Sequence, residues 1–357
     1  MTTQHHPQEH PNTASTHEPD PTRSRRRSRR PWALTGLTAV LAASAVVGVT
    51  SVEWEDSANA RSIGPDPLRS EQWALDELRL AEAHDITTGC GTTIAIVDTG
   101  VDLDHPDLRD RLTDGIDFVD DDHTPDDGNG HGTHVAGIAA ATMDNAIGIA
   151  GAAPCARIMP IRVLNDEGTG TDDDIAAGIR WAAEHHADVI NLSLGEAGFI
   201  GRLRAGGPMN EAIVDANELG AVVVAASGNE GTPRLRNYRL DVPVIVVGAI
   251  APGGEPAEFS NFGDPRTLVA PGVGILSTVP TGSTGIFPDG TSGYAELDGT
   301  SMASPYVAGV AALLVSQGHD PDAVEQLLFD TATDPGDDPR LGAGIVDAAA
   351  AVRAGRP

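Results

Sequence analysis

Apolar residues after about residue 90 fall into two kinds of run: short continuous runs, and longer runs with helical spacing. The continuous runs predict buried strands at 92–98, 156–164, 187–194, 222–227 and 244–250. The spaced runs predict helices at 131–141, 172–186, 209–220 and 301–314, and a final amphipathic helix at 342–354. Strands that alternate with helices and are apolar throughout indicate an α/β fold, with a mostly parallel central sheet and helices on both faces. No linker or repeat interrupts this pattern, so residues 61–357 are expected to form one domain.

The first 60 residues have a different character. Residues 1–31 are expected to be a disordered leader, which ends in the basic block S-R-R-R-S-R-R-P. Residues 32–60 contain an uncharged apolar run and end in A-N-A, which together describe a secretory signal peptide. The segment 28–34 also resembles a twin-arginine export signal. The alternative is an uncleaved signal that anchors the chain in a membrane, because the apolar run is long enough to span one.

Charge excludes one class of partner. The chain carries 23 Lys and Arg against 52 Asp and Glu, a formal net charge of −29. A surface that binds nucleic acid needs a surplus of positive charge, so nucleic acid is not expected as a partner.

Three polar side chains are placed to meet at one edge of the predicted sheet. Asp98 ends the first strand, His131 opens a helix, and Ser301 opens the apolar helix near the C-terminus. Ligands of parallel sheets bind at the carboxyl ends of the strands. Singly, these residues are typical of a turn, a structural histidine and a helix cap. Together they supply a nucleophile, its base and a carboxylate that orients the base, in one of the known chain orders.

The motifs around these residues resemble those of the subtilisin-like serine proteases, in particular the thermitase-like branch. They are D-T-G-V-D at 98–102, H-G-T-H-V-A-G at 131–137 and G-T-S-M-A-S-P at 299–305. The resemblance covers residues 66–357. It implies a three-layer α/β/α fold and a secreted, monomeric serine endopeptidase that cleaves proteins or peptides through an acyl-enzyme, with no catalytic cofactor.

The resemblance also implies the residues that bind the substrate. Asn229 would donate a hydrogen bond to the oxyanion, opposite the backbone N–H of Ser301. Residues of two edges and of the oxyanion loop would bind the peptide backbone: Ser193, Leu194 and Gly195, then Gly168 and Gly170, and Ala226 and Gly228. The arginines within 232–239 either favour acidic substrates or belong to a solvated loop. The solvated loop is the preferred interpretation.

Two calcium sites are implied by the same resemblance. The acidic loop 117–128 resembles a medium-affinity calcium loop, with Asp117, Asp120, Asp122, Asp126 and the Thr124 carbonyl as ligands. The alternative is a solvated acidic loop. Residues 143–149 resemble a high-affinity loop, with Asn145, Asp107 and the carbonyls of Met143, Ile147 and Ile149 as ligands. Asp66 would complete this second set, with Gln72 as the alternative.

The cysteines and the start of the domain complete the comparison with the family. By number alone, Cys90 and Cys155 form either one disulfide or two buried thiols. The family fold places their segments side by side, which implies a disulfide. Secreted relatives mostly carry a propeptide, and the interval 60–66 leaves no room for one.

Two other functions compete with that of a protease. One is a catalytically silent binding protein on the same scaffold, which would lack a catalytic residue. The other is an esterase, which would carry a G-x-S-x-G motif.

Overall fold

The computed structural model describes residues 64–194, 207–233, 242–333 and 336–356. The predicted leader, signal peptide, cleavage site and membrane anchor lie outside these residues. Within them, no helix combines the length and the apolar character needed to cross a membrane.

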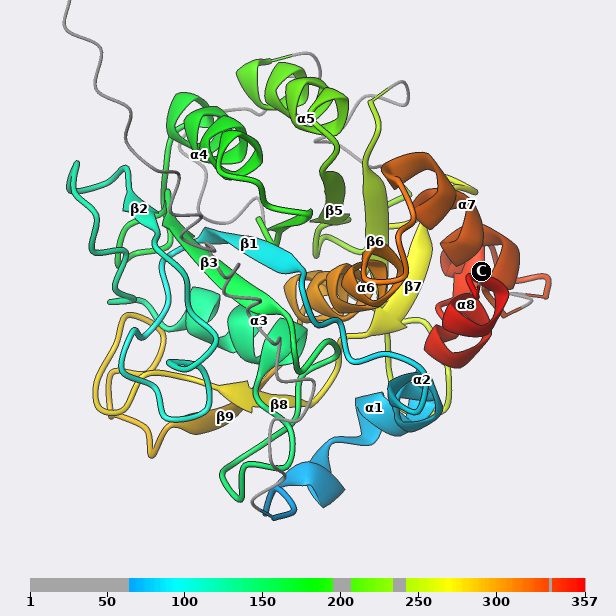
Figure 1. Ribbon diagram of the computed structural model, residues 1–357, viewed down its shortest axis with the longest axis horizontal. Coiled ribbons are helices and arrows are strands. Elements are labelled where there is room, and N and C mark those ends of the chain that lie inside the picture. Colours follow the sequence, from blue (N-terminus) through cyan, green and yellow to red (C-terminus); the bar gives the residue numbers. More distant parts are fainter. Residues whose placement is uncertain (1–63, 195–206, 234–241, 334–335, 357) are drawn as a thin grey trace, which may run out of the picture. The chain divides into compact units, whose positions relative to one another are not determined.

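A parallel sheet of eight strands forms the centre of the described chain (Figure 1). Its strands lie in the order β10-β7-β6-β5-β4-β1-β3-β2, and every adjacent pair is parallel. They are β1 Thr93–Asp98, β2 Ile116–Asp117, β3 Arg157–Arg162, β4 Val189–Leu192, β5 Val222–Ala226, β6 Ile245–Ile250, β7 Leu268–Pro271 and β10 Gly344–Ile345. β1 lies between β3 and β4, where the chain changes the direction in which it adds strands, and ligand sites in such sheets form at this point.

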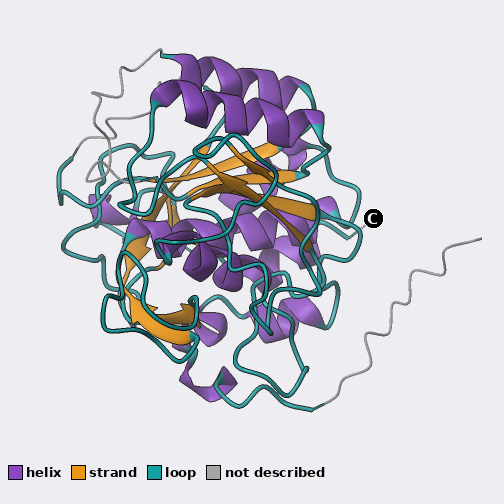
Figure 2. Cartoon of the chain, turned by 90° about the vertical axis from the view of Figure 1, so that its left-hand side faces the viewer, coloured by secondary structure: helices purple, strands orange, loops and turns teal. Residues whose placement is uncertain are grey.

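Helices cover both faces of the sheet (Figure 2). α4 and α5 pack together on one face, whereas α6 contacts five neighbouring strands and α3 packs against α6 (Figure 1). The helices are α1 Trp73–Glu77, α2 Leu80–His84, α3 His131–Ala140, α4 Asp172–Glu184, α5 Pro208–Glu218, α6 Thr300–Val315, α7 Pro321–Thr331 and α8 Ala348–Ala354. Short 3-10 turns occur at Arg69–Glu71 and Pro339–Leu341. The result is the predicted three-layer α/β/α arrangement.

The side chains of β1 show why these strands are apolar throughout. Ile94 and Ile96 belong to the core beneath α3 and α6, whereas Ala95 and Val97 belong to the core beneath α4 and α5. Successive side chains of a strand point to opposite faces, so a strand with a core on each face must be apolar at every position. This burial confirms the strands predicted from continuous runs.

α6 is the central helix, and it is enclosed by protein on all sides. All its residues from 300 to 314 are buried. A methyl group added at Gly309 would lie 2.4 Å from the Cβ atom of Ala152, so only glycine allows this approach. An enclosed helix holds its first residue, and with it Ser301, in a fixed position relative to the sheet.

The predicted helix at 342–354 is wrong in its first part. Gly344–Ile345 is a strand that pairs with Leu268 and Val269 of β7, and the helix begins only at Ala348. Asp347 accepts a hydrogen bond from the backbone N–H of Ala350, which sets the start of α8. Only long-range pairing with β7 distinguishes this short strand from a helix.

One pair of strands lies outside the main sheet. β8 Ile275–Thr278 and β9 Tyr294–Leu297 form an antiparallel pair that contacts α3. The imidazole Nε2 of His134 lies 3.0 Å from the Ile275 carbonyl oxygen and 3.1 Å from that of Ala295. Burial lowers the pKa of His134 to about 3, so the ring is neutral at ordinary pH. This histidine therefore ties the strand pair to α3.

Cys90 and Cys155 are joined by a disulfide, as predicted, with their Cα atoms 4.7 Å apart. Reducing this bond is expected to lower the free energy of unfolding by about 2–4 kcal/mol, because the bond closes a 65-residue loop in the unfolded chain. Guanidinium denaturation with and without reductant measures the difference. The matched control, with both cysteines changed to serine, should not respond to reductant. An unchanged midpoint on reduction would contradict the prediction.

Candidate active site

Asp98 and His131 form the best-defined contact at the carboxyl edge of the sheet. The Nδ1 atom of His131 lies 2.7 Å from Oδ1 of Asp98. Asp98 is completely buried at the end of β1, and its Oδ1 also accepts the backbone N–H of Thr99. The other oxygen, Oδ2, has no hydrogen-bond partner among the described residues. The carboxylate therefore fixes Nδ1 as the protonated nitrogen of a neutral imidazole.

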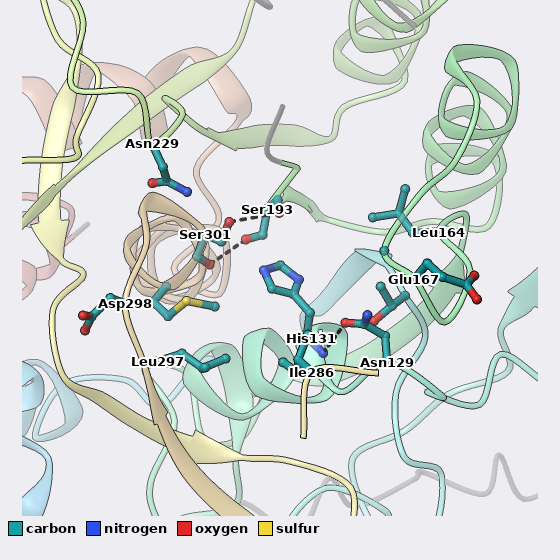
Figure 3. Close-up of a pocket in the computed structure, with 13 residues that line it drawn as sticks. Asn129, His131, Leu164, Glu167, Ser193, Asn229, Ile286, Leu297, Asp298 and Ser301 are labelled. Atoms are coloured by element: carbon teal, nitrogen blue, oxygen red, sulfur yellow. Dashed lines mark hydrogen bonds between the residues drawn. The ribbon is translucent and has the colours of Figure 1, made fainter. Parts of the chain in front are cut away.

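Ser301 lies beside this pair, in the first turn of α6. The imidazole of His131 faces Ser301 across the pocket (Figure 3). In this part of the described chain the Ser301 hydroxyl donates to the Ser193 carbonyl at 3.2 Å, and not to His131. The Ser193 hydroxyl in turn donates to the Ser301 carbonyl at 2.8 Å. Catalytic hydrogen bonds are commonly loose without substrate and tighten when it binds, so this arrangement is compatible with a nucleophile.

Asn229 is oriented by the residue that precedes Ser301. Its Oδ1 accepts the backbone N–H of Thr300 at 2.9 Å and the Thr300 hydroxyl at 3.0 Å. Both bonds occupy the oxygen, so the amide nitrogen is free to donate toward the pocket, which Asn229 lines. Ser301 is in the first turn of α6, where backbone N–H groups have no acceptor within the helix. Two donors thus border the space next to the Ser301 hydroxyl.

Asn261 shapes the loop around Asn229, and sequence analysis did not identify it. Its Oδ1 accepts the backbone N–H groups of Glu230 and Thr232, and its Nδ2 donates to the Ser227 carbonyl. One buried amide therefore holds the loop from both sides. No local motif marks Asn261, because it acts on residues about 30 positions away.

Asp127 organises the turn before His131 and was also missed. Its two oxygens accept five hydrogen bonds, from the hydroxyls of Thr99 and Thr133 and the backbone N–H groups of Asn129, Gly130 and Thr133. The side chain is 5% exposed. An acidic residue that precedes a helix by a few positions is the signal that could have found it.

His131 carries opposing influences on its pKa. Burial lowers the pKa, but the charge of Asp98, the hydrogen bond to it and the charge of Asp127 outweigh burial, so the pKa lies above its ordinary value. Neighbouring His134 is neutral and adds no positive charge. A base with a raised pKa accepts a proton more readily, which suits it to activate a hydroxyl.

Two of the predicted substrate-binding residues line the same pocket as Ser301. Ser193 and Gly168 line the pocket, and buried Leu194 follows Ser193. A Cβ atom at Gly170 would lie 2.3 Å from the Val163 carbonyl, so this glycine serves packing of the edge. Gly228 has φ 99° and donates its N–H to the Thr300 hydroxyl. The remaining two are Ala226, buried at the end of β5, and Gly195, which lies outside the described residues.

A cavity of about 370 Å³ connects these groups (Figure 3). Polar lining comes from Asn129, His131, Ser193, Asn229 and Ser301, and apolar lining from Leu164, Ile286, Leu297 and Met302. The cavity is partly open to solvent, which suits an extended chain better than a small enclosed ligand.

The predicted calcium loop at 143–149 is shaped around two buried carboxylates. Asp66 accepts the backbone N–H groups of Asp144 and Asn145, and Asp107 accepts the Asn145 amide and the Ile149 N–H. Burial raises the pKa of both carboxyls, that of Asp107 to about 6, and the charge of Asp66 contributes to this rise. Two acidic groups buried side by side need a compensating positive charge.

Backbone geometry in the same loop agrees with a cation site. Asp144 and Ala146 adopt positive φ of 57° and 62°, which is uncommon for these residue types. In the described chain the predicted ligand carbonyls, those of Met143, Ile147 and Ile149, accept no backbone hydrogen bond. The Gln72 side chain hydrogen-bonds both backbone groups of Ala150: its Nε2 donates to the carbonyl, and its Oε1 accepts the N–H.

The other predicted calcium loop, the acidic loop 117–128, is paired with a positively charged side chain. The guanidinium of Arg162 lies 2.7 Å from Asp117, 2.6 Å from Asp120 and 2.8 Å from Asp166. Asp122 accepts the Thr124 N–H, and the Thr124 carbonyl accepts the backbone N–H of Asp126. Arg162 thus competes with a cation for two of the predicted ligands, and no sequence pattern indicated this pairing.

Comparisons with known proteins agree with this geometry. The subtilase family model matches residues 89–344. Thermitase from Thermoactinomyces vulgaris is 44% identical over 268 residues, which cover 75% of this chain and 90% of thermitase. Subtilisin BL from Lederbergia lenta is 38% identical over 288 residues, covering 80% of this chain and 100% of that protein.

Solved structures extend the similarity to the fold. A protease from Pseudoalteromonas arctica superposes with a TM-score of 0.73 at 35% identity, covering 82% of this chain and 99% of that one. Residues 89–344, which the family model matches, contain the buried helix α6 and the residues that line the pocket. The chain therefore belongs to the subtilase family and is a thermitase-like serine-type endopeptidase.

Proposed function

We propose that this endopeptidase cleaves peptide bonds through Asp98, His131 and Ser301, with Asn229 as an oxyanion donor. The observation that carries the proposal is the 2.7 Å contact between His131 Nδ1 and the buried Asp98 carboxylate, beside a serine in the first turn of a helix. A silent binding protein is disfavoured because none of the four residues is lost. An esterase with a G-x-S-x-G motif is disfavoured because Ser301 is flanked by Thr300 and Met302.

The reaction follows from these positions. The Ser301 hydroxyl attacks the scissile carbonyl while Nε2 of His131 takes its proton, and Asp98 stabilises the imidazolium. The oxyanion accepts hydrogen bonds from the Ser301 N–H and the Asn229 amide. His131 then gives its proton to the departing amine, which leaves an acyl-enzyme. Water then attacks the ester carbonyl while His131 takes its proton; the bond to the Ser301 oxygen breaks, His131 returns the proton to that oxygen, and the acid is released.

The peptide is proposed to lie along the two edges that border Ser301. Ser193, Leu194 and Gly195 would pair with its backbone on one side, and Gly168 and Gly170 on the other. Ala226 and Gly228 would contact the residue before the scissile bond. The disulfide and the signal-like segment 32–60 support secretion, because disulfides persist in oxidising compartments.

Calcium is proposed as a structural ion at the loop 143–149. Asp66, Asp107 and Asn145 would hold it, with the carbonyls of Met143, Ile147 and Ile149, and it would neutralise the buried carboxylates. Asp66 is preferred over Gln72, whose side chain is already bonded to Ala150. A second ion at the acidic loop remains a prediction, since Arg162 neutralises part of that loop.

Labelling with a fluorophosphonate tests the proposed nucleophile. Intact mass should show one adduct on the native protein and none on Ser301→Ala, because only an activated serine reacts. Asn229→Ala should still be labelled but lose roughly 10²–10³ in kcat, the usual effect of losing one oxyanion donor. No adduct on a protein shown to be folded by circular dichroism would contradict the proposal.

Chelation tests the proposed calcium site. EDTA is expected to lower the Tm by about 5–10 °C, the effect of losing a ligand present well above its Kd. Asp107→Asn should have a lower Tm from the start and no further response to EDTA. Asp85→Asn, which alters an exposed carboxylate elsewhere, should respond like the native protein. A native Tm that EDTA leaves unchanged would refute the site.

The charge of Asp127 provides a test through pH. His131 must be neutral to accept a proton, so kcat/KM rises with pH as its imidazolium is lost. Because the Asp127 charge raises the pKa of His131, Asp127→Asn is expected to move this acid limb to lower pH. Thr133→Val removes one hydrogen bond to Asp127 but no charge, and should leave the limb in place. If the midpoint pH of the acid limb stays the same or rises in Asp127→Asn, His131 is not the group whose titration limits kcat/KM.

A further inference from the structure

One side chain joins the loop 143–149, where calcium is proposed to bind, to the strand pair β8–β9. Tyr294 is the first residue of β9, Tyr294–Leu297, and it is partly buried. Its hydroxyl donates to Oδ2 of Asp107 at 3.2 Å, across 187 positions of the sequence. Asp107 is a proposed calcium ligand, whereas Tyr294 belongs neither to the proposed ligands nor to the catalytic groups. The bond therefore connects the proposed ion site to a strand outside it.

A histidine makes a second link between the same two segments. The ring of His105 packs edge-on against that of Tyr294, with the ring centroids 5.4 Å apart. Its Nε2 donates to the carbonyl of Gly293, the residue before Tyr294, at 3.0 Å. Its Nδ1 accepts the backbone N–H of Asp107 at 3.2 Å, which fixes Nε2 as the protonated nitrogen. His105 thus holds the tyrosine ring and the Asp107 backbone in a fixed relation.

The backbone of the loop 143–149 lies directly against the tyrosine hydroxyl. A Cβ atom at Gly148 would lie 2.1 Å from the hydroxyl oxygen of Tyr294, and Gly148 has a φ of 41°. Any side chain at position 148 would therefore displace the tyrosine. Gly148 separates Ile147 from Ile149, whose carbonyls are proposed to bind the ion. The hydroxyl thus lies next to both the carboxylate and the backbone of the proposed site.

Tyr294 supports the Asp107 carboxylate from outside the proposed ligand set. Asp107 is 1% exposed. In the described chain its carboxylate accepts three hydrogen bonds, from the Asn145 amide, the Ile149 N–H and the Tyr294 hydroxyl. Asn145 and Ile149 are themselves proposed ligands, so only the tyrosine is an outer partner. Outer hydrogen bonds orient metal-binding side chains, and losing one typically lowers the affinity for the metal by roughly 10–100-fold.

β9 extends from the calcium loop to the active-site cavity. At one end of the strand, Tyr294 pairs with Thr278 of β8 (Figure 1). At the other end, Leu297 lines the same cavity as Ser301, which follows it by four positions. The strand therefore has one end bonded to the proposed ion site and the other end in the wall of the cavity.

We infer that Tyr294 is a positioning residue for the proposed calcium site: its hydroxyl orients Asp107 and links binding of the ion to the order of β9. The inference rests on the proposed calcium site and goes beyond it, because it assigns the ion an effect on a wall of the cavity. Coupling between two sites is reciprocal. A bond that strengthens ion binding when β9 is in place therefore also holds β9 more firmly when the ion is bound.

Calorimetric titration with calcium tests the support of Asp107. The titrations use Ser301→Ala as the background, which prevents self-digestion under the proposed mechanism, after EDTA has been used and removed. Tyr294→Phe in this background is expected to weaken binding about tenfold, because the ring stays against His105 but the hydroxyl is lost. Asp107→Asn identifies the binding event that belongs to this loop, since that event should be absent from it.

Hydrogen exchange tests the link to β9. In the Ser301→Ala background, saturating calcium is expected to slow exchange of the backbone amides of 294–297 about tenfold, within the usual range of coupling between two sites. In Tyr294→Phe, at a calcium concentration that again saturates the loop, the slowing should fall to about two- to threefold. This readout does not depend on catalytic activity.

A matched control separates the bond to Asp107 from the loss of a tyrosine hydroxyl in general. Tyr306→Phe changes a tyrosine of α6 that is 1% exposed and that is not among the donors to Asp107 in the described chain. It should keep both the affinity for calcium and the effect of calcium on β9.

The outcomes distinguish this inference from the calcium proposal. An unchanged affinity in Tyr294→Phe would overturn the inference alone, and so would weaker binding that leaves the full effect of calcium on β9. If the folded protein shows no calcium-binding event that Asp107→Asn removes, the proposed calcium site and this inference are both wrong. Labelling of Ser301 remains a separate test of the nucleophile.

Discussion

The site depends on one constraint: the charge of a buried carboxylate must be stabilised by its neighbours. Asp98 is completely enclosed, and one of its oxygens has no hydrogen-bond partner in the described chain. Keeping this charge buried is costly unless a neighbouring group compensates for it. His131 is that group, and the contact fixes its tautomer and raises its pKa. In the proposed mechanism, the contact that orients His131 as the base is therefore also the one that stabilises the buried charge of Asp98.

His131 and Ser301 each lie in the first turn of a helix. α3 presents His131 at its first residue, and Asp127 holds the preceding turn through five hydrogen bonds. α6 presents Ser301 in its first turn, and its burial from 300 to 314 prevents it from shifting. Because α3 and α6 pack against each other, His131 and Ser301 are held by two helices of one packed core.

Sequence analysis predicted the main strands and helices and proposed Asp98, His131 and Ser301, because apolar periodicity and short motifs are local signals. It did not find Asn261, whose amide acts on residues about 30 positions away, nor the ion pairs of Arg162 within the acidic loop. It also mistook Gly344–Ile345 for helix, since only pairing with β7 makes this segment a strand. These missed features are contacts between distant segments, which no single window of sequence contains.

The central claim is that Asp98, His131 and Ser301 act as one unit. A double-mutant cycle on kcat/KM tests it most directly, with Asp98→Ala, Ser301→Ala and the combined variant measured on one peptide substrate. Residues that work together are strongly non-additive, so the combined variant should be no slower than Ser301→Ala alone. If the two losses instead multiply in the combined variant, Asp98 and Ser301 contribute independently and the account is wrong.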